Sequence, residues 1–164
     1  MNYVDIKNLD VGNGFGINVS VYFSGCKFHC LNCQNKDFWD FNCGHPWTKE
    51  VEDQVIEYVK YPYVKHLCIL GGEPLQQDLT VLRDFIIRVK KESGKDVLMW
   101  TGYTWETILK DSKRLNVVRE CKILIDGQFV QEEKDLTLAH KGSRNQREIN
   151  VEESLKKNSI ILVG

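Results

Sequence analysis

The sequence predicts an α/β fold: a single compact domain over residues 1–164 whose open parallel sheet forms a partial (β/α) barrel. Short apolar runs that end near glycine alternate with amphipathic segments of helical period, a pattern typical of βαβ units. At roughly 30 residues per unit the chain has room for about five, whereas a closed eightfold barrel needs about 250 residues. A content of 42% hydrophobic and 27% charged residues is typical of a globular protein.

Four apolar runs predict the parallel strands. Each run is short and is followed by a turn that contains glycine, as expected of strands buried on both faces. The runs are Val19–Phe23, His66–Leu70, Asp96–Trp100 and Cys121–Ile125. After Gly127 the chain becomes polar, and Ile160–Val163 is predicted as one last edge strand.

Three helices are predicted between these strands. Thr48, Asp78 and Thr104 are suitable N-caps, and Gly94 lies just beyond the end of the second helix. In each segment the apolar residues fall on one face, which we expect to pack in the core. These residues are Val51, Val55, Tyr58 and Val59 in the first helix, Leu79, Leu82, Phe85, Ile86 and Val89 in the second, and Ile108 and Leu109 in the third.

The charge balance, the first residues, the length of the apolar runs and the number of cysteines argue against several classes of protein. Lysine and arginine total 22 against 23 acidic residues, so direct nucleic-acid binding through overall positive charge is not expected. The first residues contain an early acid and no apolar stretch typical of a signal peptide, and no run is long enough to span a membrane. Six cysteines are too few for a disulfide-dense secreted scaffold. The sequence therefore predicts a cytoplasmic protein.

The most specific motif is C-x3-C-x2-C, formed by Cys26, Cys30 and Cys33 directly after the first predicted strand. Thiolates are soft ligands that suit iron–sulfur clusters, zinc or copper. A cubane cluster has four irons, so three local thiolates would leave one iron without a protein ligand. A small molecule could bind that open iron and accept an electron there.

A zinc site is the main alternative for these cysteines. Structural zinc takes four ligands, commonly as two C-x2-C pairs or with histidines at fixed spacing. Only Cys30 and Cys33 form such a pair, so Cys43, His29 or His45 would have to complete the set at irregular spacing. The two remaining cysteines lie in apolar strand runs and are expected in the core: Cys68 and Cys121.

A second motif, Gly71-Gly72-Glu73-Pro74, follows the second predicted strand. Ligands of open α/β sheets lie outside the carboxyl ends of the strands, and glycine lets the backbone approach them closely. Backbone groups here, with the Glu73 carboxylate, could hold the ammonium of an amino acid. Thr101-Gly102-Tyr103 and Asp126-Gly127 end two more strands, and all four turns should converge on one edge of the sheet. Dinucleotide-binding and P-loop fingerprints do not occur.

The cysteine motif after one strand and the G-G-E-P turn after the next resemble the radical S-adenosylmethionine superfamily. Further stretches resemble one family of glycyl-radical activases within it, the activating proteins of anaerobic ribonucleoside-triphosphate reductases. These stretches are Asn13-Gly14-x-Gly16, Trp100-Thr101-Gly102-Tyr103, Leu124-Ile125-Asp126-Gly127-x-Phe129 and Gly142-Ser143-x-Asn145-Gln146-Arg147. The resemblance covers most of the chain.

The resemblance implies a reaction and a set of ligands. Cys26, Cys30 and Cys33 would bind three irons of a 4Fe–4S cluster, and S-adenosylmethionine would chelate the fourth. An electron from a flavodoxin-like donor would cleave the sulfonium, and the 5′-deoxyadenosyl radical would take hydrogen from a backbone glycine of the large reductase subunit.

The resemblance also implies contacts to S-adenosylmethionine, position by position. Asn32 and Gln34, which flank the third cysteine, would lie near the adenine. Gly71, Gly72 and Glu73 would meet the amino end of methionine, while Thr101 and Asp126 would face its carboxylate or the ribose. The basic stretch from Lys141 to Arg147 would be a candidate for docking the partner.

The chain departs from the family pattern at several positions, and other functions stay open. Asn32 stands where many superfamily members have an aromatic residue, and Phe15 and Asn18 replace the proline and arginine of a common early loop. Glu73 replaces aspartate and lengthens the carboxylate by one methylene. The alternatives are radical chemistry on a small, deazapurine-like molecule, or a zinc-binding interaction module without enzymatic activity.

Overall fold

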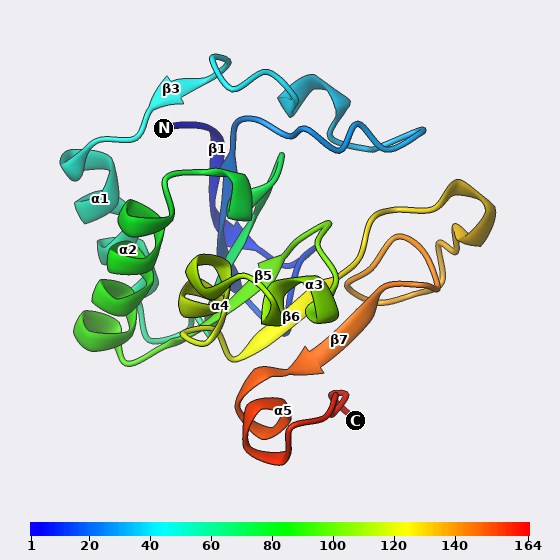
Figure 1. The fold of residues 1–164 in the computed structure, drawn as a ribbon. Helices are drawn as coiled ribbons and strands as arrows, with labels where there is room; N and C mark the ends of the chain where they lie inside the picture. The colour runs from blue at the N-terminus through cyan, green and yellow to red at the C-terminus, as the bar shows by residue number, and fades with distance from the viewer.

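The computed structural model describes residues 1–164 and has one seven-stranded sheet in the order β3-β1-β2-β4-β5-β6-β7 (Figure 1). The four central strands β2, β4, β5 and β6 are parallel and lie side by side in the order in which they occur in the chain. The antiparallel strands β1 and β7 flank them. The strands are β1 Asn2–Asp10, β2 Asn18–Phe23, β3 His45–Pro46, β4 His66–Gly71, β5 Asp96–Trp100, β6 Ile123–Asp126 and β7 Arg147–Asn150. The carboxyl ends of the parallel strands therefore share one edge of the sheet.

Five α-helices connect the strands: α1 Lys49–Val59, α2 Leu79–Ser93, α3 Trp105–Leu109, α4 Ser112–Val118 and α5 Val151–Lys157. The Thr48 side chain accepts from the Val51 amide at the start of α1, and Asp78 caps α2 in the same way. Gly94 ends α2 in the left-handed region, at φ 70°. Short 3-10 helices occupy Lys36–Phe38, Pro74–Gln76 and Gln131–Glu133.

Both faces of the central strands are buried. Alternate residues of β2, such as Val19, Val21 and Phe23, join the larger apolar core with α1 and α2. Tyr22 lies on the opposite face, in a smaller cluster that contains Cys68. Figure 1 shows α1, α2 and α4 along one side of the sheet, while the segment between β6 and β7 projects away from it. Burial on both faces explains why these strands are continuous apolar runs instead of alternating ones.

The structure confirms the α/β class, the single compact domain, the four parallel strands and the three helices with their caps. The sheet is open, and its closure into a partial barrel stays a prediction. The edge strand predicted at Ile160–Val163 is reduced to an isolated bridge between Leu162 and Ile149 on the outer side of β7, flanked by hydrogen bonds from Asn150 N to Ile161 O and from Val163 N to Glu148 O. Cys68 and Cys121 are buried in the core, as predicted.

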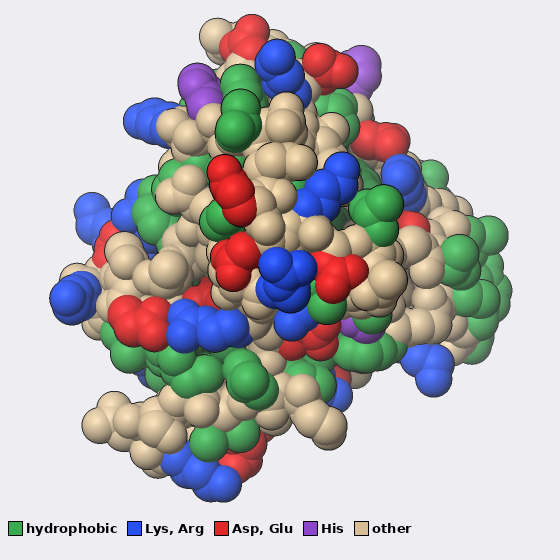
Figure 2. All heavy atoms as spheres, turned by 90° about the vertical axis from the view of Figure 1, so that its right-hand side faces the viewer, with side chains coloured by type: hydrophobic (Ala, Val, Ile, Leu, Met, Phe, Trp, Pro, Cys, Tyr) green, Lys and Arg blue, Asp and Glu red, His purple; other side chains and the backbone are tan.

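The surface carries charges of both signs. On the face turned toward the viewer in Figure 2, acidic and basic side chains lie next to each other, and no large patch of a single sign is seen. None of the helices combines the length and the hydropathy that crossing a bilayer requires.

Candidate active site

A cavity of about 430 Å³ opens at the carboxyl ends of the parallel strands. The turns after β2, β4, β5 and β6 all reach it, as the sequence predicted from the four strand ends. Among the predicted site residues, those that line it are Cys26, Cys30, Cys33, Gln34, Gly71, Gly72, Glu73 and Thr101. Asn32 and Asp126 are the two predicted residues that do not line it.

The cysteine loop is fixed to the rest of the protein at its first ligand. Gly25 N donates to Phe38 O at 2.7 Å, and Cys26 N donates to Trp39 O at 3.0 Å. Cys26 is buried, whereas Cys30 and Cys33 are half-buried on a turn closed by the hydrogen bond from Cys33 N to Cys30 O. One thiol is thus held rigidly, and the other two lie where a bound group can reach them.

The protein environment raises the pKa of two of these thiols, Cys26 and Cys30. Burial raises the pKa of Cys26, against hydrogen bonds from the Phe28 and His29 backbone, and Glu73 and Cys30 raise it further. Burial also raises the pKa of Cys30, and Cys33 adds to the effect. Thiols bind metals as thiolates. The positive charge of bound metal ions must therefore offset the free energy that deprotonating these thiols costs.

The donor set fits a cluster better than a single ion. All six cysteines are free thiols, and no three His, Cys, Asp or Glu side chains gather around one point as the ligands of a single metal ion would. Thiols spread along a turn can each bind a different iron of one cluster.

The glycines of the G-G-E-P turn allow the chain to pass close to the cysteine loop. Gly71 has φ 132°, in the region that favours glycine. A Cβ at Gly72 would overlap the Gly25 backbone, because Glu73 N donates to Gly25 O at 2.7 Å just beyond. The close contact brings the cysteine loop and the turn after β4 to the same cavity.

Glu73 connects the turns after β4 and β5. Its Oε1 accepts from Thr101 Oγ1 at 2.7 Å and from Leu75 N at 3.0 Å, and its Oε2 accepts from Gly102 N at 2.7 Å. The residue is only 1% exposed, and burial raises the pKa of its carboxyl to about 7 against these hydrogen bonds. Glu73 therefore lines the cavity and also holds together the two turns that form it.

Asp126 is engaged by the protein instead of facing the cavity. Its carboxylate is 1% exposed and accepts from Arg147 Nε at 3.0 Å, Arg147 Nη2 at 2.6 Å and Trp105 N at 2.8 Å. Arg147 also binds Glu106 through both terminal nitrogens. Asn32 is exposed and adopts a left-handed backbone, at φ 58°.

Sequence reasoning missed several residues that shape the site. Asn35 lines the cavity and donates from Nδ2 to Gly71 O at 2.8 Å. Phe28 packs edge-on against Tyr103 with ring centroids 4.8 Å apart. Phe129 also lines the cavity. The positions of Phe28 and Asn35 within and beside the cysteine motif were the only signal available for them.

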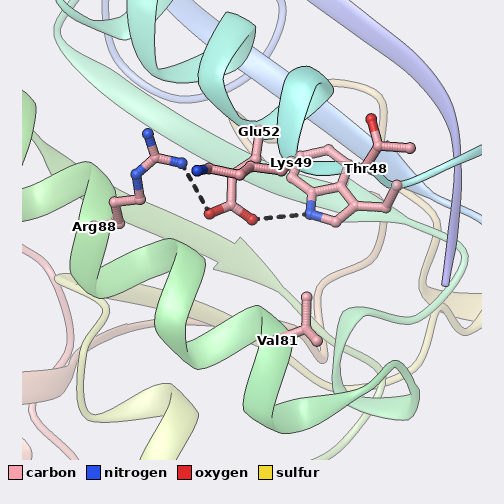
Figure 3. Close-up of a pocket in the computed structure, with 6 residues that line it drawn as sticks. Thr48, Lys49, Glu52, Val81 and Arg88 are labelled. Atoms are coloured by element: carbon pink, nitrogen blue, oxygen red, sulfur yellow. Dashed lines mark hydrogen bonds and ion pairs between the residues drawn. The ribbon is translucent and has the colours of Figure 1, made fainter.

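A second, more open cavity of about 470 Å³ lies between α1 and α2 (Figure 3). Glu52 accepts from Trp47 Nε1 at 3.2 Å and from Arg88 Nη1 at 3.3 Å, and Arg88 also pairs with Asp53 and Glu92. Its acidic group is thus engaged by Trp47 and Arg88, and Lys49 also lines the cavity.

Comparison with known proteins places the chain. The family model described as 4Fe-4S single cluster domain matches residues 12–149, which include the cysteine motif and the turns after β4, β5 and β6. An anaerobic ribonucleoside-triphosphate reductase-activating protein of Pasteurella multocida is 37% identical over 150 residues, 89% of this chain and 95% of that protein. The chain belongs to this family of activating proteins.

Two further relatives carry the same name. The activating protein of Escherichia coli K12 is 36% identical over 89% of this chain and 96% of its own length. That of Enterobacteria phage T4 is 31% identical over 90% of this chain and 92% of its own length. This member of the family therefore spans nearly the whole length of these relatives.

Proposed function

We propose that this protein activates an anaerobic ribonucleoside-triphosphate reductase through radical S-adenosylmethionine chemistry at a 4Fe–4S cluster. The observation that carries the proposal is that Cys26, Cys30 and Cys33 line one cavity with Gly71, Gly72 and Glu73. The names of the relatives and the 4Fe-4S family model support it.

The three cysteines would hold the cluster and leave the fourth iron to the amino and carboxylate groups of S-adenosylmethionine. When bound, the cluster would supply one electron to the sulfonium, so that its bond to the 5′ carbon would break to give methionine and a 5′-deoxyadenosyl radical, which would take hydrogen from a glycine of the reductase. We propose a reduced flavodoxin-like protein as the source of the electron.

The residues of the chain would bind and orient S-adenosylmethionine. Gly71 and Gly72 let this turn pass against the backbone of Phe23 and Gly25, beside the cysteine loop, and the buried Glu73 carboxylate would favour the ammonium of the methionine end there. Gln34, exposed in the cavity wall, would meet the adenine, and Asn32, exposed beside it, would act from the rim. Thr101 would act mainly by fixing Glu73.

Asp126 would support the site indirectly, by fixing the end of β6 through its pair with Arg147. In the sheet, β2, β4, β5 and β6 lie side by side in the order in which they follow one another in the chain, as the strands of a (β/α) barrel do. We therefore propose that the open sheet forms part of such a barrel.

A protein substrate fits the mouth of the cavity better than a small molecule. Leu136 lines the cavity and is 82% exposed, and Leu31, between two of the cysteines, is 69% exposed. Large exposed apolar side chains beside a cavity are typical of protein contact surfaces. They would suit a loop of the large reductase subunit, with the reacting glycine presented to the cavity.

Anaerobic cluster reconstitution followed by an assay for 5′-deoxyadenosine tests the proposal. The wild-type protein should bind iron and sulfide and should cleave S-adenosylmethionine when strongly reduced. Cys26→Ala should lose iron with little loss of fold, while Cys43→Ala, a matched change at a half-buried loop thiol, should retain it. Equal iron content in the two variants would contradict the assignment of Cys26.

The reductase itself separates the alternatives. A glycyl radical, detected by electron paramagnetic resonance after mixing with the large reductase subunit, is the expected product. Cleavage of S-adenosylmethionine with hydrogen transfer only to a deazapurine-like molecule would favour the small-molecule alternative. One tightly held zinc without iron or sulfide would favour the interaction module.

A further inference from the structure

The polar stretch Lys141–Arg147 holds the backbone that follows β6. Asn145 Nδ2 donates to Gln128 O at 2.8 Å, and Gln146 Nε2 donates to Gly127 O at 2.9 Å. Side chains that the sequence left as a docking candidate are thus used inside the protein. They fix the path of the chain where it leaves the sheet and enters the cavity wall.

The stretch is itself held in one conformation. Gln146 Oε1 accepts from Gly142 N at 2.9 Å and from Ser143 N at 3.2 Å. Ser143 is fully buried; its Oγ donates to Asn145 Oδ1 and accepts from Val130 N at 3.2 Å. A turn with its polar groups paired in this way is a rigid support for the segment it binds.

The supported segment meets a cysteine of the proposed cluster. Cys30 Sγ lies 3.6 Å from Gln128 Oε1, a contact between residues 98 positions apart. Gln128 and the neighbouring Phe129 both line the cavity that holds Cys30.

Hydrogen bonds to a cluster sulfur change its redox behaviour. Reduction adds negative charge to the cluster and its thiolates, so donors to sulfur stabilise the reduced state and raise the potential. Here the Cys30 thiol donates to Gln128 Oε1; a thiolate bound to iron has no proton to donate, so Gln128 would keep the contact by turning its amide over to present N–H.

We propose that Gln128 helps to set the reduction potential of the cluster through its contact with the Cys30 sulfur. Asn145 and Gln146 are positioning residues that hold the backbone of Gln128 and Gly127 in place. The inference rests on the proposed function, because it requires the cluster, but it assigns a role that the cluster ligands alone do not give.

The test is the midpoint potential of the reconstituted full-length protein, measured by an anaerobic redox titration monitored by electron paramagnetic resonance. Gln128→Leu removes the amide without adding charge and should lower the equilibrium constant for reduction about fivefold, which corresponds to about 40 mV. Gln54→Leu, at an exposed position on α1, is the control and should leave the potential unchanged. The Gln128 side chain is exposed, so the fold should tolerate the change.

Asn145→Ala tests the positioning role without placing an apolar side chain beside Cys30. It should lower the potential in the same direction, with full iron content, whereas Asn116→Ala on α4 should not. Loss of iron from Gln128→Leu, with thermal unfolding of the metal-free protein unchanged, would also support the contact with Cys30.

Potentials equal to those of the controls in both variants would overturn the inference. If the wild-type protein assembled no 4Fe–4S cluster, the proposed function itself would fail. If it held a cluster and cleaved S-adenosylmethionine while neither variant shifted the potential, only the role of the segment after β6 would be wrong.

Discussion

Glu73 should make the stability of the metal-free protein depend on pH. The carboxyl is 1% exposed, and burial raises its pKa from 4.5 to about 7. A raised pKa in the folded state means that folding favours the protonated form. The contribution to stability is therefore complete below pH 4.5 and is lost as the pH rises through about 7.

The size of the effect follows from the two pKa values. Between about pH 5 and pH 8, ionisation of a group whose pKa rises from 4.5 to about 7 should lower the free energy of unfolding by about 2 to 3 kcal/mol. Glu73→Gln cannot ionise and keeps an oxygen for Thr101 and Leu75, so this component should disappear. The variant loses the acceptor for Gly102 N at every pH.

Urea unfolding under reducing conditions at several pH values measures the effect, and the difference between wild type and Glu73→Gln isolates it from other groups. Glu132→Gln, an exposed position in the segment after β6, is the matched control and should follow the wild type. The reasoning is refuted if wild type and Glu73→Gln lose stability equally between pH 5 and pH 8.

Three further changes test the frame of the site. Gly72→Ala should prevent cluster assembly, because its Cβ would overlap the Gly25 backbone; normal iron content would contradict the close packing. Arg147→Ala should cost about 3 to 5 kcal/mol in urea unfolding, because it leaves the buried Asp126 carboxylate unpaired; a loss below about 1 kcal/mol would show that the pair is dispensable. If the ionised Glu73 carboxylate contacts the ammonium of S-adenosylmethionine, binding by the reconstituted protein should weaken as the pH falls below about 7. Calorimetry should then show proton release on binding near neutral pH. An affinity that does not depend on pH would rule out that contact for Glu73.

The sequence predicted the elements whose signals are local. α2 follows from Asp78 at its start, one apolar stripe and Gly94 after its end. β1 was missed because it lies near an edge of the sheet and alternates exposed charges such as Lys7 with half-buried residues. β7 and α5 were missed because the chain after Gly127 has few apolar residues, and pairing with β6 supplies what the pattern lacks.

The candidate site divides in the same way. The spacing of Cys26, Cys30 and Cys33 predicts a metal-binding loop, because a ligand motif works over a few residues of backbone. Asp126 could not be placed, since whether its carboxylate faces a ligand or Arg147 depends on a strand 21 positions further along the chain.

The amino-acid sequence by itself determined the fold class, the parallel strands and the cysteine motif, because each depends on periodicity or spacing within one segment. Only the tertiary structure decided that Glu73 joins two turns, that Asp126 binds Arg147, and that the segment after β6 reaches Cys30. These contacts join residues that are distant in the chain. They depend on how whole strands pair, which the local sequence around each residue does not determine.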